Sequence, residues 1–315
     1  MSALEAVFNR VIDIASFFSV ITYTFTIFII TKYTPKHMNA FARSLLNIFY
    51  WNYSVNLLWM VARPFPMMPL SCFMLKGLVG YINSEILGHV VFAFTLLAVV
   101  NVSIALFLCF QLRYMAIAWS RETRNVSTIW FYAYAGFLHV LFSSIYIWFY
   151  ILWILPADQQ TNSNLFCYNP MVIRPTIFLF TLSSSVGIGV ATFISLSFYT
   201  LKKMRQFMSE RTIKMQEALL WNLILLSSVP ISFGAISYYL LSLGMYLHKS
   251  FFSQVMCVVA SLALVSHGPV YCVNCLLLFN VYREAVKNIA YKVLRIERIE
   301  NRSVRLFTTI SRDTK

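Results

Sequence analysis

Charged residues are scarce in this sequence. Of its 315 residues, 11% are charged and 59% are hydrophobic, and the mean hydropathy is +0.70. An ordinary soluble domain contains roughly 25% charged residues, so this chain cannot cover its apolar surface in water. The composition excludes a soluble globular protein and predicts an integral membrane protein.

Glycine and proline are also few, at 9 residues each. Both residues interrupt helices, so their scarcity favours long, continuous helices with a small number of breaks. Transporters typically contain internal repeats and broken helices, and ion-coupled ones need ionisable groups at mid-membrane depth. We find no repeat and no Asp, Glu, Lys or Arg near the middle of any apolar segment. These absences argue against a pump and leave a small-solute transporter or channel as an alternative function.

The residue patterns of an enzyme or a resident cofactor are missing as well. The five histidines are scattered without metal-ligand spacing, and no nucleophile is accompanied by a general base. No lysine lies in the middle of the last apolar segment, which excludes a retinal Schiff base. The net charge of +14 comes from short clusters between apolar segments, which is a membrane-topology pattern. We therefore expect no enzymatic activity, no cofactor, no metal and no nucleic-acid partner.

Seven apolar segments are long enough to cross the roughly 30 Å hydrocarbon layer of a bilayer as helices. They cover residues 11–31, 44–62, 85–112, 128–155, 176–201, 217–243 and 251–279. The first segment lacks the cleavage site and the short charged region of a signal peptide, so we interpret it as a retained helix. The sequence predicts an all-α membrane protein, with a seven-transmembrane helix bundle over residues 1–281 and a tail at 282–315.

The distribution of Lys and Arg predicts the orientation of the bundle. Twenty of the 25 basic residues lie in one alternating set of connections together with the tail, and five lie in the other set. Because basic connections remain in the cytosol, we expect the N-terminus outside and the C-terminus in the cytosol. In the tail, residues 282–299 alternate an apolar stripe with a basic face, which predicts an amphipathic helix on the lipids of the inner leaflet.

Two of the six cysteines are separated from the others. Cys109, Cys257, Cys272 and Cys275 lie within predicted spans, as ordinary buried thiols. Cys72 and Cys167 lie in two different outer loops, on the oxidising side of the membrane, and each is the only cysteine of its loop. A disulfide between them would tie the start of the third span to the longest outer loop. Two free thiols are the alternative.

Several uncharged polar residues are expected inside the bundle. Amide and imidazole side chains in membrane helices usually turn inward and hydrogen-bond to neighbouring helices. The candidates are Asn52, Asn56, Asn101, His139 and Asn274. For the asparagines of the second span, a ligand contact is the alternative interpretation.

Two spans contain a residue that should interrupt the helix. Pro230 lies midway along the sixth span and displaces the carbonyl of Leu226, so we expect a kink that is either a static bend or a lever. The seventh span carries His267, Gly268 and Pro269, which we expect to form a hinge. In that hinge His267 is interpreted as an interior hydrogen-bonding residue rather than a ligand contact.

The third span ends in Arg113 and Tyr114. An arginine at a cytosolic helix end most often extends its charge into water. On the third of seven helices, it is also a candidate for contact with a cytosolic partner. The remaining candidates for this coupling surface are basic residues of the next cytosolic connection, namely Lys202, Lys203, Arg205, Arg211 and Lys214.

Short motifs follow one another in a fixed order between residues 30 and 290. They are Tyr33-Thr34-Pro35 with Met38, Leu45-Leu46-Asn47, Arg113-Tyr114, Gln216, Pro230, His267-Gly268 and Tyr282-Arg283 at the end of the last span. In this order and spacing they resemble the nematode serpentine chemoreceptors of the Str superfamily, with the Srh and Sri branches nearest. The chain departs from the resemblance in two places. Pro269 follows His267-Gly268, and Gln111 stands where those branches often have an acidic residue or Asn.

The resemblance implies a G-protein-coupled receptor. Such a receptor detects an odorant or pheromone, activates a heterotrimeric G protein and lies in the plasma membrane of chemosensory neurons, including their cilia. The coupling surface described above would then contact the G-protein α subunit. Because Gln111 is not acidic, the expectation that an acid beside Arg113 holds its guanidinium at rest is weakened.

Overall fold

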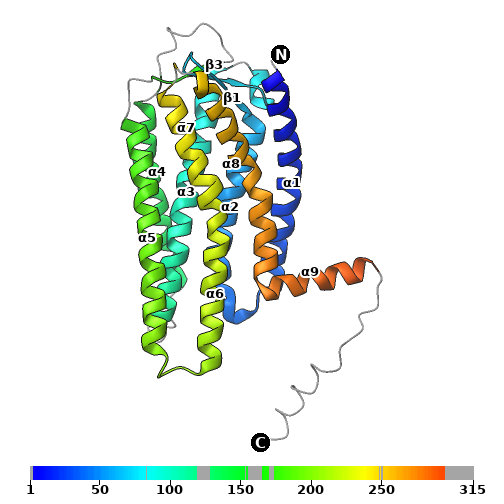
Figure 1. Ribbon diagram of the computed structural model, residues 1–315, viewed down its shortest axis with the longest axis vertical. Coiled ribbons are helices and arrows are strands. Elements are labelled where there is room, and N and C mark those ends of the chain that lie inside the picture. The colour runs from blue at the N-terminus through cyan, green and yellow to red at the C-terminus, as the bar shows by residue number, and fades with distance from the viewer. Residues whose placement is uncertain are drawn as a thin grey trace, which may run out of the picture.

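The computed structural model describes residues 3–82, 84–118, 128–152, 154, 165–169, 174–247, 249 and 251–294. Seven helical rods lie side by side in one bundle (Figure 1). They are α1 (Ala3–Tyr33), α2 (Asn39–Ala62), α3 (Glu85–Ala118), α4 (Thr128–Ile151), α5 (Arg174–Met204), the continuous rod of α6 (Glu210–Val229), η4 (Pro230–Ala235) and α7 (Ile236–Tyr246), and α8 (Phe251–Leu278). This arrangement confirms the predicted seven-transmembrane bundle.

Among the described residues, six of these rods are long and apolar enough to cross a membrane, and α2 is the seventh. The length of α2 is sufficient, but Arg43, Asn47, Asn52 and Asn56 lower its mean hydropathy. Asn52 and Asn56 are buried against other helices, so these amides are not exposed to lipid. The helix is polar because it lies inside the bundle, in contact with α1, α3 and α8.

A small antiparallel sheet covers one end of the bundle. It consists of β1 (Pro64–Met67), β2 (Cys72–Leu75) and β3 (Leu165–Cys167), paired in that order. Proline is tolerated in β1 because this strand lies at the edge of the sheet. The prolines between α2 and α3 predict a non-helical connection. Nothing in the local sequence pattern predicts that this connection forms strands or that β2 pairs with β3, about a hundred residues later. We call residues 64–75 and 165–168 the lid; η2 (Leu78–Ile82) leads from the lid to α3.

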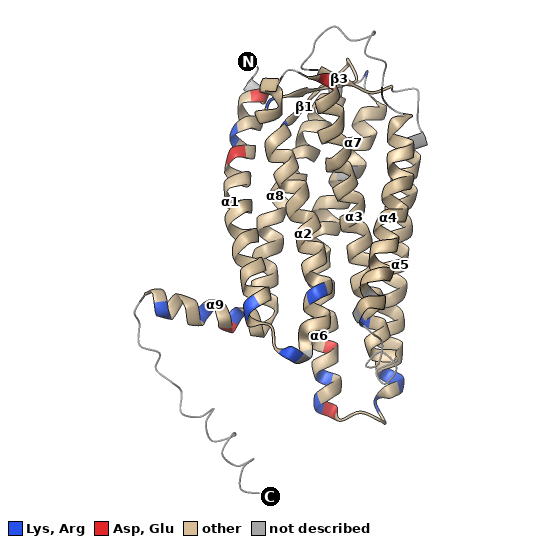
Figure 2. Ribbon diagram, turned by 180° about the vertical axis from the view of Figure 1, so that it is seen from behind, with Lys and Arg blue, Asp and Glu red and all other residues tan. Residues whose placement is uncertain are grey.

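The opposite end of the bundle carries η1 (Lys36–Met38), the turn between α5 and α6, and α9 (Asn280–Val293), which runs sideways from the foot of α8 (Figure 1). Figure 2 shows that Lys and Arg gather here, on α9 and beside the α5–α6 turn. We call it the basic end. The N-terminus lies at the lid end. The basic tail after residue 294 lies outside the described residues.

Candidate functional site

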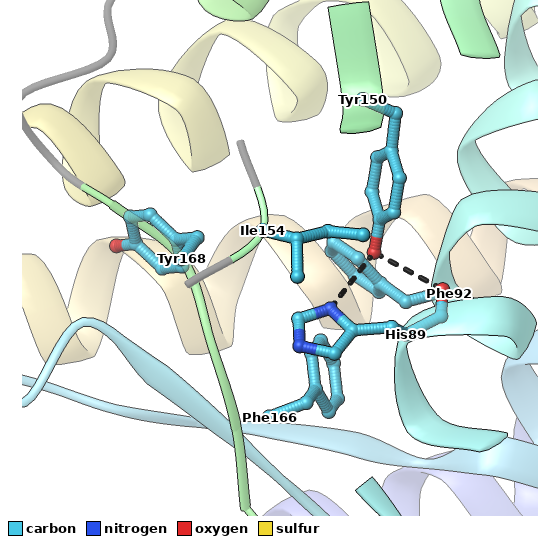
Figure 3. Close-up of a pocket in the computed structure, with 6 residues that line it drawn as sticks. All are labelled: His89, Phe92, Tyr150, Ile154, Phe166 and Tyr168. Carbon is cyan, nitrogen blue, oxygen red and sulfur yellow. Dashed lines mark hydrogen bonds between the residues drawn. The ribbon is translucent and has the colours of Figure 1, made fainter. Parts of the chain in front are cut away.

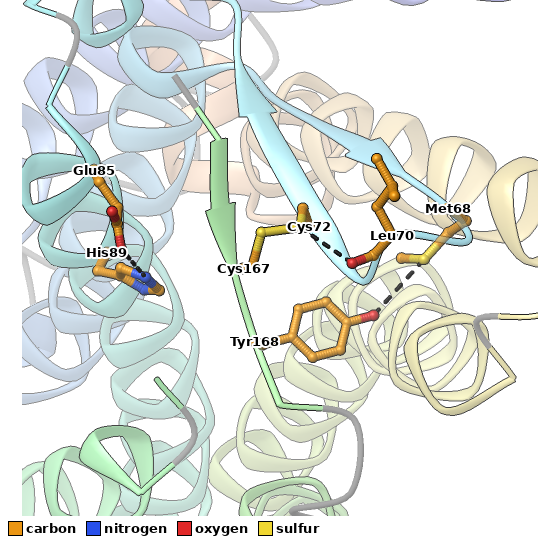
Figure 4. Close-up of a disulfide and its surroundings, with 7 residues drawn as sticks. All are labelled: Met68, Leu70, Cys72, Glu85, His89, Cys167 and Tyr168. Atoms are coloured by element: carbon orange, nitrogen blue, oxygen red, sulfur yellow. Dashed lines mark hydrogen bonds and ion pairs between the residues drawn. A yellow bond between two sulfur atoms is a disulfide. The ribbon is translucent and has the colours of Figure 1, made fainter. Parts of the chain in front are cut away.

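The lid is closed by a disulfide. Cys72 of β2 and Cys167 of β3 are register partners in the sheet and are bonded to each other, which confirms the predicted pair (Figure 4). Phe166 of β3 packs on Phe92 of α3, with ring centroids 5.0 Å apart. The bond therefore joins the α2–α3 and α4–α5 connections into one layer that rests on α3.

Hydrogen bonds hold the lid to the last two helices of the bundle. The Gln254 amide of α8 accepts from the backbone N–H of Met68 at 2.8 Å and donates to the carbonyl of Pro66 at 2.5 Å. The hydroxyl of Tyr168 donates to the carbonyl of Met245 on α7 at 3.3 Å. Burial raises the pKa of Tyr168, so this hydroxyl remains a donor. The lid is thus fixed to α7 and α8 by groups that point toward it.

Two ion pairs connect the first helix to the lid end. Lys76 lies 2.7 Å from Glu5, and Arg63 pairs with Asp13. The Glu5 carboxylate is 13% exposed and the Asp13 carboxylate is 55% exposed, so only the first pair is substantially withdrawn from water. Both acids of α1 therefore have basic partners beside the lid.

A small cavity lies directly beneath the lid, between α3, α4 and β3 (Figure 3). Its volume is about 10 Å³, which is room for roughly one water molecule. The lining residues are His89, Phe92, Tyr150, Ile154, Phe166 and Tyr168. In this conformation the space accepts one small chemical group and not a whole odorant.

A buried polar network joins α1, α2 and α8 in the middle of the bundle. Ser19 donates to the Asn56 side chain at 3.3 Å, and Asn56 donates to the carbonyl of Asn52 at 3.0 Å. His267 lies 2.5 Å from the carbonyl of Leu264 and 3.2 Å from the Asn52 amide. If the neutral ring donates to that carbonyl, its other nitrogen must accept, and the Asn52 NH₂ group supplies the donor. The structure thus brings together three of the predicted interior residues.

Gly268 lies beside this network at a close helix approach. A Cβ atom at Gly268 would lie 2.8 Å from Cε2 of Tyr23 and 3.1 Å from Nδ2 of Asn56. The neighbouring Pro269 lies inside α8, which continues as a helix from Phe251 to Leu278. The span is therefore not interrupted at the proline, and the hinge at His267, Gly268 and Pro269 stays a prediction. The helix tolerates the proline, as membrane helices do when neighbouring groups satisfy the freed backbone.

A second polar network joins α2, α3 and α4. Nδ1 of His139 lies 2.5 Å from Oδ1 of Asn101, and Nε2 lies 3.1 Å from the Asn47 amide. Asn101 also donates to Ser143 at 3.0 Å. Both ring nitrogens of His139 are therefore occupied by protein groups. Asn274, the remaining predicted interior residue, is half-buried on α8 and joins neither network among the described residues.

The helix at Pro230 is widened rather than ended. Pro230 begins the π-helical segment η4, which continues the rod from α6 into α7. Ser228 donates to the carbonyl of Leu225 at 2.7 Å and Ser232 donates to the carbonyl of Ser228 at 2.7 Å. Side chains thus bond to backbone carbonyls that flank the proline, which is how a membrane helix accommodates one.

Arg113 is buried at the basic end and contacts α6. Its guanidinium donates to the side-chain oxygen of Gln216 and, at 3.2 Å, to the backbone carbonyl of the same residue. The residue is only 8% exposed, so its charge is not extended into water. Tyr114 packs on Phe193 of α5, with ring centroids 5.8 Å apart. The end of α3 is thus joined to both α5 and α6, and its charge is held by a neutral amide.

The other basic residues of the predicted coupling surface lie around this contact and are exposed. They are Lys202, Lys203, Arg205, Arg211 and Lys214. Lys214 pairs with Glu210 one helical turn earlier, at 2.9 Å. These residues flank the turn from α5 to α6, so the structure places them on one side of the basic end (Figure 2).

The Tyr282-Arg283 motif fixes the start of α9. Thr34 donates to the carbonyl of Ile30 at 2.5 Å, and the buried Tyr282 hydroxyl lies 3.1 Å from Thr34 Oγ1, so Tyr282 is the donor between them. Burial raises the pKa of Tyr282 to about 12, which keeps this donor protonated. Arg283 is exposed and donates to Asn280 at 2.6 Å. The motif therefore joins α9 to the foot of α1.

Comparison with known protein families decides the identity. Residues 3–292 match the family described as serpentine type 7TM GPCR chemoreceptor Srh. The chain belongs to the Srh chemoreceptor family. The match confirms the resemblance drawn from the motifs, and it places this Srh chain in a receptor family rather than an enzyme family.

Comparison with solved structures shows the fold of the Srh receptor. The crystal structure of squid rhodopsin superposes with a TM-score of 0.57 at 12% sequence identity, over 94% of this chain and 89% of the rhodopsin chain. At this identity the likeness concerns the helix bundle alone. A search of curated proteins finds no match.

Several residues of the Srh receptor that make these contacts were not predicted as site residues. The sequence places Gln216 in a motif but does not indicate its contact with Arg113. Asn47 and Gln254 are uncharged polar residues within apolar spans, and this property was the available signal. For His89 and Glu85, the sequence signal was only their position near the outer end of the third span.

Proposed function

We propose that this Srh receptor detects an environmental small molecule, an odorant or pheromone, and activates a cytosolic heterotrimeric G protein. The observation that carries the proposal is the buried Arg113, held across the α3–α6 contact by Gln216 at the end opposite the lid. A positive charge withdrawn from water and held by one neutral side chain can be released by a modest separation of two helices.

The lid end faces the outside in this proposal, and the basic end faces the cytosol. The disulfide between Cys72 and Cys167 supports this orientation, since disulfides persist in oxidising compartments. The concentration of Lys and Arg at the opposite end supports it independently. The N-terminus is then outside, and α9 lies along the lipids of the inner leaflet of the plasma membrane. The nematode origin and the ciliary membrane belong to the same proposal.

Activation follows from the contacts of α6. A ligand bound beneath the lid would favour a conformer in which the first half of this helix moves away from α3, with η4 as the flexible segment. This movement separates Gln216 from Arg113. The freed guanidinium, together with the exposed basic residues of the α5–α6 turn, then meets the G-protein α subunit. Ligand binding at the lid end is thus coupled to nucleotide exchange at the basic end through the rod of α6, η4 and α7.

The test is nucleotide exchange by purified receptor in lipid nanodiscs with a panel of G-protein α subunits. A ligand is first identified by applying an odorant panel to cells that express the chain. We expect Arg113→Ala to abolish the ligand-dependent exchange. Arg43→Ala is the matched control, because Arg43 is at the same end but lies over the ring of Tyr132, 5.7 Å from its centroid.

Two results would contradict the proposal. A full response of Arg113→Ala would remove this residue from coupling. Solute flux in proteoliposomes without any nucleotide exchange would favour the transporter or channel alternative over a receptor.

A further inference from the structure

The cavity beneath the lid contains a histidine nitrogen with an unused lone pair. The single hydroxyl hydrogen of Tyr150 is donated to the backbone carbonyl of His89, at 3.1 Å. Nδ1 of His89 lies 3.4 Å from the same hydroxyl oxygen, so Nδ1 must be the donor there. The neutral ring then carries no hydrogen on Nε2. Among the residues that the structure describes, this nitrogen has no hydrogen-bond partner, and it is buried in a residue that is 8% exposed.

A carboxylate lies next to this nitrogen. Oε1 of Glu85, one helical turn before His89, is 3.9 Å from Nε2 (Figure 4). That separation is too long for a hydrogen bond, and two acceptors have no reason to approach. Two other acids at the lid end, Glu5 and Asp13, have basic partners in Lys76 and Arg63. Within the described part of the chain, Glu85 and His89 thus present two acceptors without a donor between them.

Aromatic rings form most of the wall of the cavity. The centroid of Phe166 lies 5.0 Å from that of Phe92 and 5.4 Å from that of His89. Tyr168 contributes its ring, while its hydroxyl points away and donates to the carbonyl of Met245 (Figure 3). Ring faces attract cations. Nε2 of His89 is thus an unused acceptor in a residue that lines the cavity, Glu85 lies beside that residue without lining the cavity, and the aromatic lining favours positive charge.

We propose that this cavity is a subsite for the ammonium head group of a small amine. An ammonium carries three donors and a positive charge, which suit Nε2 of His89, the Glu85 carboxylate and the aromatic faces together. A carboxylate would meet only acceptors. A neutral alcohol could bond to Nε2 but would gain little from the charge of Glu85. At about 10 Å³ the cavity takes the head group alone, and the remainder of the ligand extends past Glu85, whose side chain is 20% exposed.

The inference rests on the proposed receptor function, so binding is measured separately from signalling. The apparent melting temperature of the receptor in nanodiscs is recorded against increasing n-hexylamine, n-hexanol and hexanoate. We expect a saturable increase with n-hexylamine that exceeds the effect of the other two. Glu85→Gln should weaken the apparent amine affinity about tenfold or more, because a charge-assisted contact is lost. Asp13→Asn is the matched control, since Asp13 is paired with Arg63, and should leave the affinity unchanged.

Three results would overturn the subsite. The first is an equal increase in melting temperature with n-hexylamine and n-hexanol. The second is an unchanged amine affinity in Glu85→Gln. The third is a melting-temperature shift that acid alone produces and that amine does not increase, which would indicate a proton site only. Saturable, Glu85-dependent amine binding without nucleotide exchange would leave the subsite standing and refute the receptor proposal. Nucleotide exchange in response to other ligands, without amine binding, would support the receptor proposal and refute the amine subsite.

Discussion

Gly268 sets the distance between α8 and the first two helices, and replacing it with alanine is expected to destabilise the bundle. The added Cβ would lie 2.8 Å from Cε2 of Tyr23, 3.0 Å from its hydroxyl oxygen and 3.1 Å from Nδ2 of Asn56. Contacts this short require the neighbours to move. Tyr23 is fully buried and Asn56 is bonded to Ser19, so movement disturbs the network that joins the three helices.

The expected magnitude is the difference between two effects. Overpacking a well-packed interior typically costs about 1–3 kcal/mol. Replacing glycine by alanine within a helix contributes about 1 kcal/mol in the opposite direction. The matched control is Gly136→Ala on α4, where an added Cβ has no neighbour within 4 Å among the described residues, so only the second effect applies. Gly268→Ala should therefore be less stable than Gly136→Ala by about 1–3 kcal/mol.

The assay is the apparent melting temperature of each purified variant in the same detergent. Gly268→Ala should melt below the parent protein or near it, and Gly136→Ala at or above it. A double variant with Tyr23→Ala tests the cause, because removing the ring removes two of the three short contacts. The reasoning fails if the two alanine variants are equally stable, or if Gly268→Ala costs as much without the Tyr23 ring as with it.

Three further predictions concern the two ends of the bundle. Gln216→Leu removes the side-chain acceptor of Arg113 and leaves only the backbone carbonyl of residue 216, so ligand-independent nucleotide exchange should rise; an unchanged basal rate would contradict the role of the side-chain contact. Cys167→Ser removes the covalent link between β2 and β3 and should reduce surface expression and ligand affinity, measured by surface labelling and dose response. Thr34→Val removes the acceptor of Tyr282 and should cost about 1 kcal/mol, seen as a lower melting temperature; an unaltered melting temperature would argue against this bond.

The bundle and the disulfide could be predicted because each depends on information carried locally by the sequence. A membrane span is a long apolar segment, and each of the seven can be recognised from its own residues without knowledge of the others. Cys72 and Cys167 were identified because the other four cysteines lie within spans. Pairing required no knowledge of geometry beyond the side of the membrane on which each loop lies.

The contacts that complete the candidate sites could not be predicted because they join distant positions. Gln254 bonds to Pro66 across 188 residues, and His267 meets Asn52 across 215 residues. Each of these polar residues was visible within its span, but its partner depends on how the helices pack. The lid sheet could not be predicted for the same reason. Its strands β2 and β3 are separated in the sequence by α3 and α4, and they pair only once the chain has folded.

The arrangement of polar contacts favours α6 as the moving element in the proposed activation. α1, α2 and α8 share buried bonds in the middle of the bundle, so separating them would leave several polar groups without partners in an apolar surrounding, at about 1–3 kcal/mol each. α6 is bonded to its neighbours near the basic end, through Gln216 to Arg113 and through Asn222 to the carbonyl of Leu278 at 2.9 Å. Both contacts lie on the same side of η4. In the proposed activation, a rotation of α6 about that segment would break these two contacts and leave the central network intact, so α6 is expected to move at a lower cost than α1, α2 or α8.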